Sequence, residues 1–185
     1  MSRLPRLTPD ELDPDQQRLY AAITGGARGE GTQWFDLTDD DGRLEGPFNA
    51  MLMAPGLGHP LQALGAALRF LGTLSARARE LAILTVAAHW GSGFERRAHE
   101  AIGAGLGLSA AELAAIRDQA PLTLSDATEA VVLATVRQLL TTGGLDARSY
   151  EAAVTQLGPD GLFEVTTLVG YYGLLALQLR VFAVP

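Results

Sequence analysis

Two ionisable residues, Glu95 and His99, lie four positions apart between Gly93 and Gly105. Residues at this spacing share one face of a helix. A carboxylate beside an imidazole stabilises the imidazolium form, so such a pair can hold and transfer a proton. Ser92, three positions before Glu95, belongs to the same helical stripe. The spacing therefore predicts a proton-transfer site in which His99 and Glu95 are catalytic candidates.

The same residues also have a purely structural interpretation. Ser92-x-x-Glu95 matches a capping box, in which the glutamate reaches back to the backbone at the start of the helix. His99 would then be a partly buried histidine bonded to Glu95. The sequence leaves both interpretations open.

A further carboxylate, Glu80, precedes the apolar run Leu81 to Ala88. Burial raises the pKa of a carboxyl group and makes it a useful acid or base near neutral pH. Glu80 joins the catalytic candidates if its helix packs antiparallel to the helix of His99 across Gly91. Otherwise Glu80 is a first-turn acid that interacts with the helix dipole and a neighbouring arginine.

Substrate binding would fall to cationic and polar side chains near this segment. Arginine holds carboxylates through paired hydrogen bonds. The candidates are Arg69, Arg77 and Arg79, together with Ser92 and Trp90.

No metal or cofactor is expected. His59, His89 and His99 lack the HxxxH and HxH spacings of metal ligands. The glycine-rich segments lack the GxxxxGK pattern that binds phosphate. The chain contains no cysteine, which excludes a catalytic thiol.

The composition of the chain limits the kinds of partner that we expect. The net charge of −7 argues against nucleic acid, whose phosphates select basic surfaces. Only 19% of the residues are charged, so we expect another subunit to cover some apolar surface. The apolar run Val165 to Leu179 is too short to span a hydrocarbon core of roughly 30 Å and is expected to be a buried helix. The N-terminus has no apolar signal-peptide region. We therefore expect a cytoplasmic homo-oligomer that binds no membrane.

The elements that must position these residues are all helical, because no stretch alternates like a strand. A single domain is expected, with an N-terminal helix and extended arm in 1–47 and a helical core in 48–185. The arm carries Trp34 and Phe35, which are costly to expose, and one turn at 40–42. The expected helices are 14–23, 48–53, 59–70, 75–90, 93–103, 110–118, 125–140, 147–157 and 159–184.

The sequence of the helical core contains a weak internal repeat. Leu74-Ser75 recurs fifty residues later as Leu124-Ser125, and both copies continue as a long helix, a glycine turn and a shorter helix. This order predicts a duplicated helical hairpin. Glu80 and His99 would correspond to Ala130 and Ser149, so the ionisable set would exist in the first copy only.

These motifs resemble the carboxymuconolactone decarboxylase and alkylhydroperoxidase D-like family over most of the chain from about Leu44. The resemblance rests on Arg-Glu-Leu-Ala-Ile-Leu at 79–84, Glu95-x-x-x-His99, the segments 46–49, 105–112 and 170–172, and the ending Val181 to Pro185. It implies an all-helical fold with a duplicated helical unit. It also implies a homotrimer or, as a dimer of trimers, a homohexamer.

The two branches of this family differ at the positions of interest. The peroxidase branch carries CxxCxxxH with a glutamate twelve residues before the first cysteine. Glu80 and His99 match that pattern, but Ser92 and Glu95 replace the cysteines. The decarboxylase branch has glutamate at the second of these positions and keeps the histidine.

Three functions follow as hypotheses. The first is a decarboxylase-like lyase that acts on a small carboxylate or lactone through His99, Glu95 and Glu80, without a cofactor. The second is a peroxidase-like protein that has lost its dithiol. The third is a non-catalytic, ligand-binding oligomer.

Overall fold

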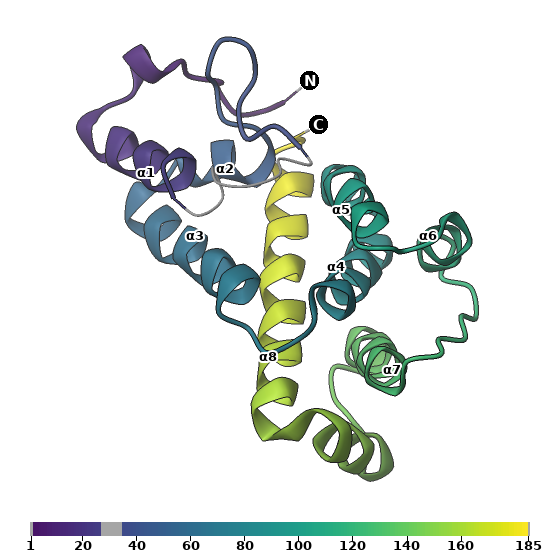
Figure 1. Cartoon of the computed structure of the whole chain (residues 1–185). Coiled ribbons are helices and arrows are strands. Elements are labelled where there is room, and N and C mark those ends of the chain that lie inside the picture. The colour runs from purple at the N-terminus through teal and green to yellow at the C-terminus, as the bar shows by residue number, and fades with distance from the viewer. Residues whose placement is uncertain (1, 27–34, 185) are drawn as a thin grey trace. The chain divides into compact units, whose positions relative to one another are not determined.

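The computed structural model describes residues 2–26 and 35–184. Within these residues the chain is all-α, as predicted, and forms no strand beyond an isolated bridge between Thr38 and Leu44. Figure 1 shows the helices: η1 (Pro9–Glu11), α1 (Pro14–Thr24), α2 (Gly46–Met51), α3 (Pro55–Phe70), α4 (Ala76–Trp90), α5 (Gly93–Gly105), α6 (Ala110–Arg117), α7 (Ala127–Thr142) and α8 (Ala147–Val181).

The described residues form two compact units. The first comprises Met1–Leu71 with Leu177–Pro185, and the second comprises Gly72–Ala176. We expected an arm and a core that divide after Pro47, whereas α2 and α3 group with the N-terminal helices. The reason is packing between α1 and α3. Leu19 and Ile23 of α1 are fully buried. A Cβ at Gly58 of α3 would lie only 2.6 Å from Cδ2 of Leu19, so glycine is needed for this close contact.

The described part of the arm is anchored within the first unit. Asp39 accepts hydrogen bonds from the backbone amides of Asp41 and Arg43, which closes the expected turn, and Gly42 takes the left-handed conformation (φ 78°). The Tyr20 hydroxyl donates to the Gly42 carbonyl at 2.9 Å. Phe35 is half-buried, while Trp34 lies outside the described residues.

Helix α4 is the centre of the second unit. Its residues from 80 to 87 are all buried, which explains why its sequence is apolar on every side. Ser75 caps the start by accepting from the Ala78 amide, and Gly91 ends the helix in the left-handed conformation (φ 64°). Both ends were predicted, because both are encoded by residues next to them.

A buried carboxylate also fixes the approach to α4. Glu164 of α8 accepts hydrogen bonds from the Thr73 amide and hydroxyl and from the Leu74 amide. These donors belong to the turn that leads into Ser75. Glu164 therefore ties α8 to the segment before α4.

Two helix limits differ from those expected. Helix α3 begins at Pro55, so Pro60 lies inside its second turn and not at its start. Helix α8 contains a non-helical residue, Gly158 (φ 71°, ψ 170°), which separates the two expected helices on either side. Both segments are otherwise helical as predicted.

Helix α8 is the one described helix that is long and apolar enough to cross a membrane by length and composition alone. Core helices share that character, and α8 buries one face in this protein. Its buried side chains recur at helical spacing: Leu162, Val165, Leu168, Tyr171, Leu175 and Leu179.

Candidate functional site

The centre of the candidate site is a buried pair between neighbouring helices of the second unit. Nδ1 of His99 on α5 lies 2.6 Å from Oε2 of Glu80 on α4, and the two residues are 8% and 3% exposed. Glu80 precedes Gly91 by 11 residues and His99 follows it by 8, so in an antiparallel hairpin they lie roughly 16 Å and 12 Å from the turn, within one helical turn of each other. Figure 1 shows α4 and α5 side by side.

This pairing answers the question that the sequence left open for Glu80. Its carboxylate is not a solvated first-turn acid, because His99 occupies one oxygen and the residue is buried. Because an ionised carboxylate only accepts hydrogen bonds, we assign the shared proton to Nδ1 of the imidazole. The partner of His99 is therefore Glu80, and the expected bond between His99 and Glu95 is not formed.

Glu95 is buried without a hydrogen-bond partner. It is 2% exposed, and neither carboxylate oxygen is bonded to any described residue. Burial raises the pKa of Glu95 to about 7, against the opposing influence of Ser92 and of His99. A carboxyl group in this state is poised to give or take a proton near neutral pH.

The capping-box interpretation fails at this helix. Ser92 occupies the N-cap position of α5, but its hydroxyl makes no capping bond and has no partner among the described residues. Glu95 does not reach back to the backbone either. Ser92 nevertheless lies close enough to Glu95 to lower the pKa of its carboxyl group, so the two buried side chains lie together at the start of α5.

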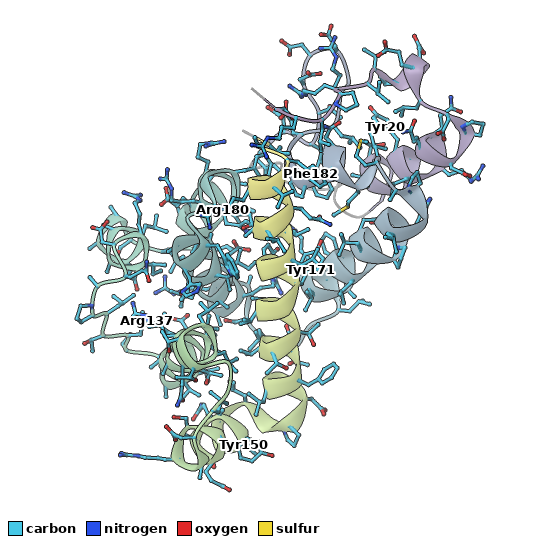
Figure 2. The ribbon with its side chains drawn as sticks, turned by 180° about the vertical axis from the view of Figure 1, so that it is seen from behind. Tyr20, Arg137, Tyr150, Tyr171, Arg180 and Phe182 are labelled. Carbon is cyan, nitrogen blue, oxygen red and sulfur yellow. The ribbon has the colours of Figure 1, made fainter. Side chains whose placement is uncertain are left out.

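A tyrosine of α8 completes the surroundings of His99. The Tyr172 ring meets the imidazole edge-to-face, with centroids 5.3 Å apart, and Tyr171 packs on Tyr172 in the same manner at 5.2 Å. Figure 2 labels Tyr171 on α8. Both tyrosines belong to a segment that carried the family resemblance, yet no site role was predicted for them. Nothing local in the sequence indicates that they meet His99.

Two of the predicted substrate-binding arginines differ in whether their guanidinium groups are already bonded to the protein. Arg79 has a buried Nε without a partner among the described residues. Arg77 is committed to Glu112, Glu129 and the Gly107 carbonyl, so its guanidinium does not serve a substrate.

The two remaining candidates, Trp90 and Arg69, pack against their neighbours. The Trp90 ring is 37% exposed and lies over Gly173, where a Cβ would meet its Nε1 at 3.4 Å. Arg69 belongs to the first unit and stacks on the Phe70 ring at 5.7 Å. Among the described residues, the Glu80–His99 pair forms no hydrogen bond with Trp90 or Arg69.

Among the described residues, no group of three His, Asp or Glu side chains is arranged to hold a metal ion. The arrangement is suited to proton chemistry: one carboxyl group without a partner, and one imidazole held by a second carboxylate. The sequence analysis named all three residues. Its conditional pairing of Glu80 with His99 is formed, whereas the bond it expected between Glu95 and His99 is not.

Comparison with solved structures gives the fold class. A putative antioxidant defence protein AhpD from Agrobacterium tumefaciens has a TM-score of 0.66 at 16% identity and covers 74% of this chain and 94% of its own. A peroxidase-related protein from Silicibacter sp. TM1040 has a TM-score of 0.74 at 14% identity over 100% and 91%. The debrominase Bmp8, solved with 2,3,4-tribromopyrrole as a cysteine-to-alanine variant, has a TM-score of 0.72 at 11% identity over 98% and 90%.

No protein-family profile matches the chain, and no curated protein matches it in sequence. The structural likeness shows that the chain has the all-helical alkylhydroperoxidase D-like fold, which the resemblance had indicated. The chain lacks the cysteines of a dithiol site, and Ser92 and Glu95 stand at the two positions where the resemblance places them.

Proposed function

We propose that the protein is an enzyme of carboxymuconolactone decarboxylase type that transfers a proton to or from a small carboxylate or lactone. One observation carries the proposal. Glu95 is buried with both oxygens unbonded, one helical turn from an imidazole that a second carboxylate holds.

Each residue has a distinct role in the proposed reaction. Loss of CO2 from the substrate leaves its electron pair on the adjacent carbon as an enolate. Protonated Glu95 gives its proton to that carbon and becomes a carboxylate, which water then reprotonates. Glu80 holds Nδ1 of His99, so Nε2 is the nitrogen available to bind or exchange a proton with the substrate.

The fold neighbours support a small-molecule substrate without defining it. The debrominase is described with a bound brominated pyrrole, and the other two neighbours are described in terms of peroxidase and antioxidant defence. Thiol-based reduction requires a thiolate that attacks and a second thiol that resolves the product. This chain has neither, so we do not extend dithiol peroxidase chemistry to it.

The test is a panel of small 3-oxo acids and unsaturated lactone acids, incubated with the protein in D2O. Proton NMR follows both loss of the carboxylate and deuterium uptake at the adjacent carbon. We expect turnover of at least one compound by the wild type. Glu95→Gln and His99→Asn should each slow it by roughly 10²-fold or more. No turnover of any compound, or equal rates in all three proteins, would contradict the proposal.

A further inference from the structure

A cavity of about 180 Å³ lies in the second unit, away from the site described above. Thr85 and His89 contribute its α4 wall. His89 follows Glu80 by nine residues, which at 100° per residue places it on the opposite face of α4. Helices α6 and α7 supply the other walls, so the cavity is separated from the Glu80–His99 pair by the body of α4.

The charge in this cavity comes from Arg137 of α7, which Figure 2 labels. Its Nη2 donates to the Ala120 carbonyl at 2.7 Å. Among the described residues, no carboxylate forms an ion pair with it. A half-buried guanidinium without a counter-ion favours an anion, and a carboxylate matches its planar fork of donors.

Neutral polar groups surround the guanidinium. Gln119 and Thr141 line the cavity beside it, and both are exposed, so they mark the side that opens to solvent. Gln119 holds a left-handed backbone (φ 53°), which a non-glycine residue adopts at a cost. That conformation sets its amide at the edge of the cavity, where its one bond, to the Ala88 carbonyl, is long at 3.5 Å.

Two apolar side chains complete the lining of the cavity. Ile116, which is buried in the core, and Leu140 present hydrocarbon to the cavity. The volume is close to that of an engineered apolar cavity of roughly 150 Å³ that binds benzene. A ligand of about one ring, with an anionic head toward Arg137 and an apolar body toward Ile116 and Leu140, fits both the size and the chemistry.

We propose that this cavity binds a small carboxylate with an apolar body of about one ring, anchored by Arg137. The site is distinct from the proton-transfer site and does not depend on the function proposed for it. Inorganic phosphate carries the charge but lacks the apolar body, and it should therefore bind less well than an aromatic carboxylate.

The experiment is an NMR titration of the full chain with benzoate, and a parallel titration with inorganic phosphate. We expect benzoate to shift the resonances of Arg137 and Gln119 and to show contacts between its ring protons and the methyl groups of Ile116 and Leu140. Phosphate should bind at least several-fold more weakly. No detectable binding of benzoate at roughly 10 mM, a concentration that reveals even weak fragment binding, would overturn the proposal. Ring contacts to Tyr172 in place of Ile116 would overturn it as well.

Substitutions distinguish a loss of ligand binding from a loss of folding. Arg137→Gln should weaken benzoate binding about tenfold or more, and Arg137→Lys should weaken it less, because the charge is kept but the fork is lost. Gln119→Gly relieves the left-handed backbone and should fold normally while it loses part of the affinity. Glu95→Gln should bind benzoate in the cavity as the wild type does. Unchanged affinity in a folded Arg137→Gln protein would refute the role of the arginine.

Discussion

Nδ1 of His99 lies 2.6 Å from Oε2 of Glu80, and both side chains are buried. The bond fixes the orientation of the imidazole, because the Glu80 carboxyl group occupies Nδ1. The imidazole therefore presents Nε2 to any substrate, whichever charge state His99 adopts.

The first prediction concerns this bond. In ¹⁵N-labelled protein we expect an Nδ1-bound proton on His99 that exchanges slowly with water, because the pair is buried. Glu80→Gln should abolish that signal or move it, and should destabilise the protein by roughly 3 kcal/mol or more, as the loss of one partner of a buried pair does. A wild-type protein whose His99 carries its neutral-form proton on Nε2 would contradict the assignment.

The second prediction concerns the pH dependence of stability. The pKa of Glu95 is raised from an ordinary 4.5 to about 7 by burial. Between these values the unfolded chain ionises first, so folding stability falls as pH rises from about 4.5 to 7 and then levels off. The loss approaches about 3 kcal/mol, at 1.36 kcal/mol for each pH unit.

Glu95→Gln removes this titration. We expect urea denaturation to show that, relative to the wild type, the free energy of unfolding of the variant is up to about 3 kcal/mol higher at pH 8 than at pH 5. Glu151→Gln, on the exposed surface of α8, is the control and should leave the pH dependence unchanged. If wild type and Glu95→Gln keep the same difference at both pH values, the Glu95 carboxyl group does not titrate as stated.

The third prediction concerns Arg77, which joins α4 to α7. Its Nε donates to both oxygens of Glu129 at 3.0 and 3.2 Å, and Glu129 is 8% exposed. Arg77→Met would leave that carboxylate buried and unpaired, so we expect a loss of roughly 3 kcal/mol in chemical denaturation. Arg117→Met breaks an exposed pair with Glu100 and should cost at most about 1 kcal/mol. Equal losses would show that burial does not govern the Arg77 interaction.

The fourth prediction is the homo-oligomer, which stays a prediction from the sequence. Four of the large apolar side chains that α8 exposes lie on one stripe of the helix: Phe163 (72%), Leu174 (41%), Leu177 (50%) and Val181 (49%). With Thr167 and Gly170 they follow the four–three spacing of a helix–helix seam. We propose that a second copy covers this stripe.

Light scattering tests it at micromolar concentration. The wild type should exceed the monomer mass of 19.5 kDa, with a trimer or hexamer as the expected assembly. Phe163→Glu combined with Leu174→Glu should shift the mass to the monomer, whereas Thr166→Glu, off the stripe, should not. A monomeric wild type would refute the prediction.

The sequence predicts best where the cause is local. The helices that follow Ser75, Asp13 and Ser109 begin close to the predicted positions. These three residues cap them, and a cap bonds only to residues two or three positions away. The Ser92–Glu95 pattern suggested a capping box that is not formed, because it too reflects the local sequence alone. It meets the local rule, but burial of Glu95 depends on neighbouring helices that the pattern does not contain.

Long-range contacts could not be predicted from spacing. Glu164 meets Thr73 across 91 positions, and Tyr172 meets His99 from a different helix. The cavity at Arg137 draws on three helices, and no local pattern marks it. The Glu80–His99 pair was accessible because one glycine turn joins the two helices, so a single assumption about their packing was enough.

The Gly91 turn has a consequence for the order of folding. The Glu80–His99 contact closes a loop of 19 positions, whereas the Glu164–Thr73 contact closes one of 91. Closing a short loop costs less chain entropy, so the α4–α5 hairpin can assemble before α8 docks. The chemically important residues then belong to the earliest part of the chain to become ordered. Mutations in this hairpin should slow folding, while mutations at Glu164 should mainly speed unfolding.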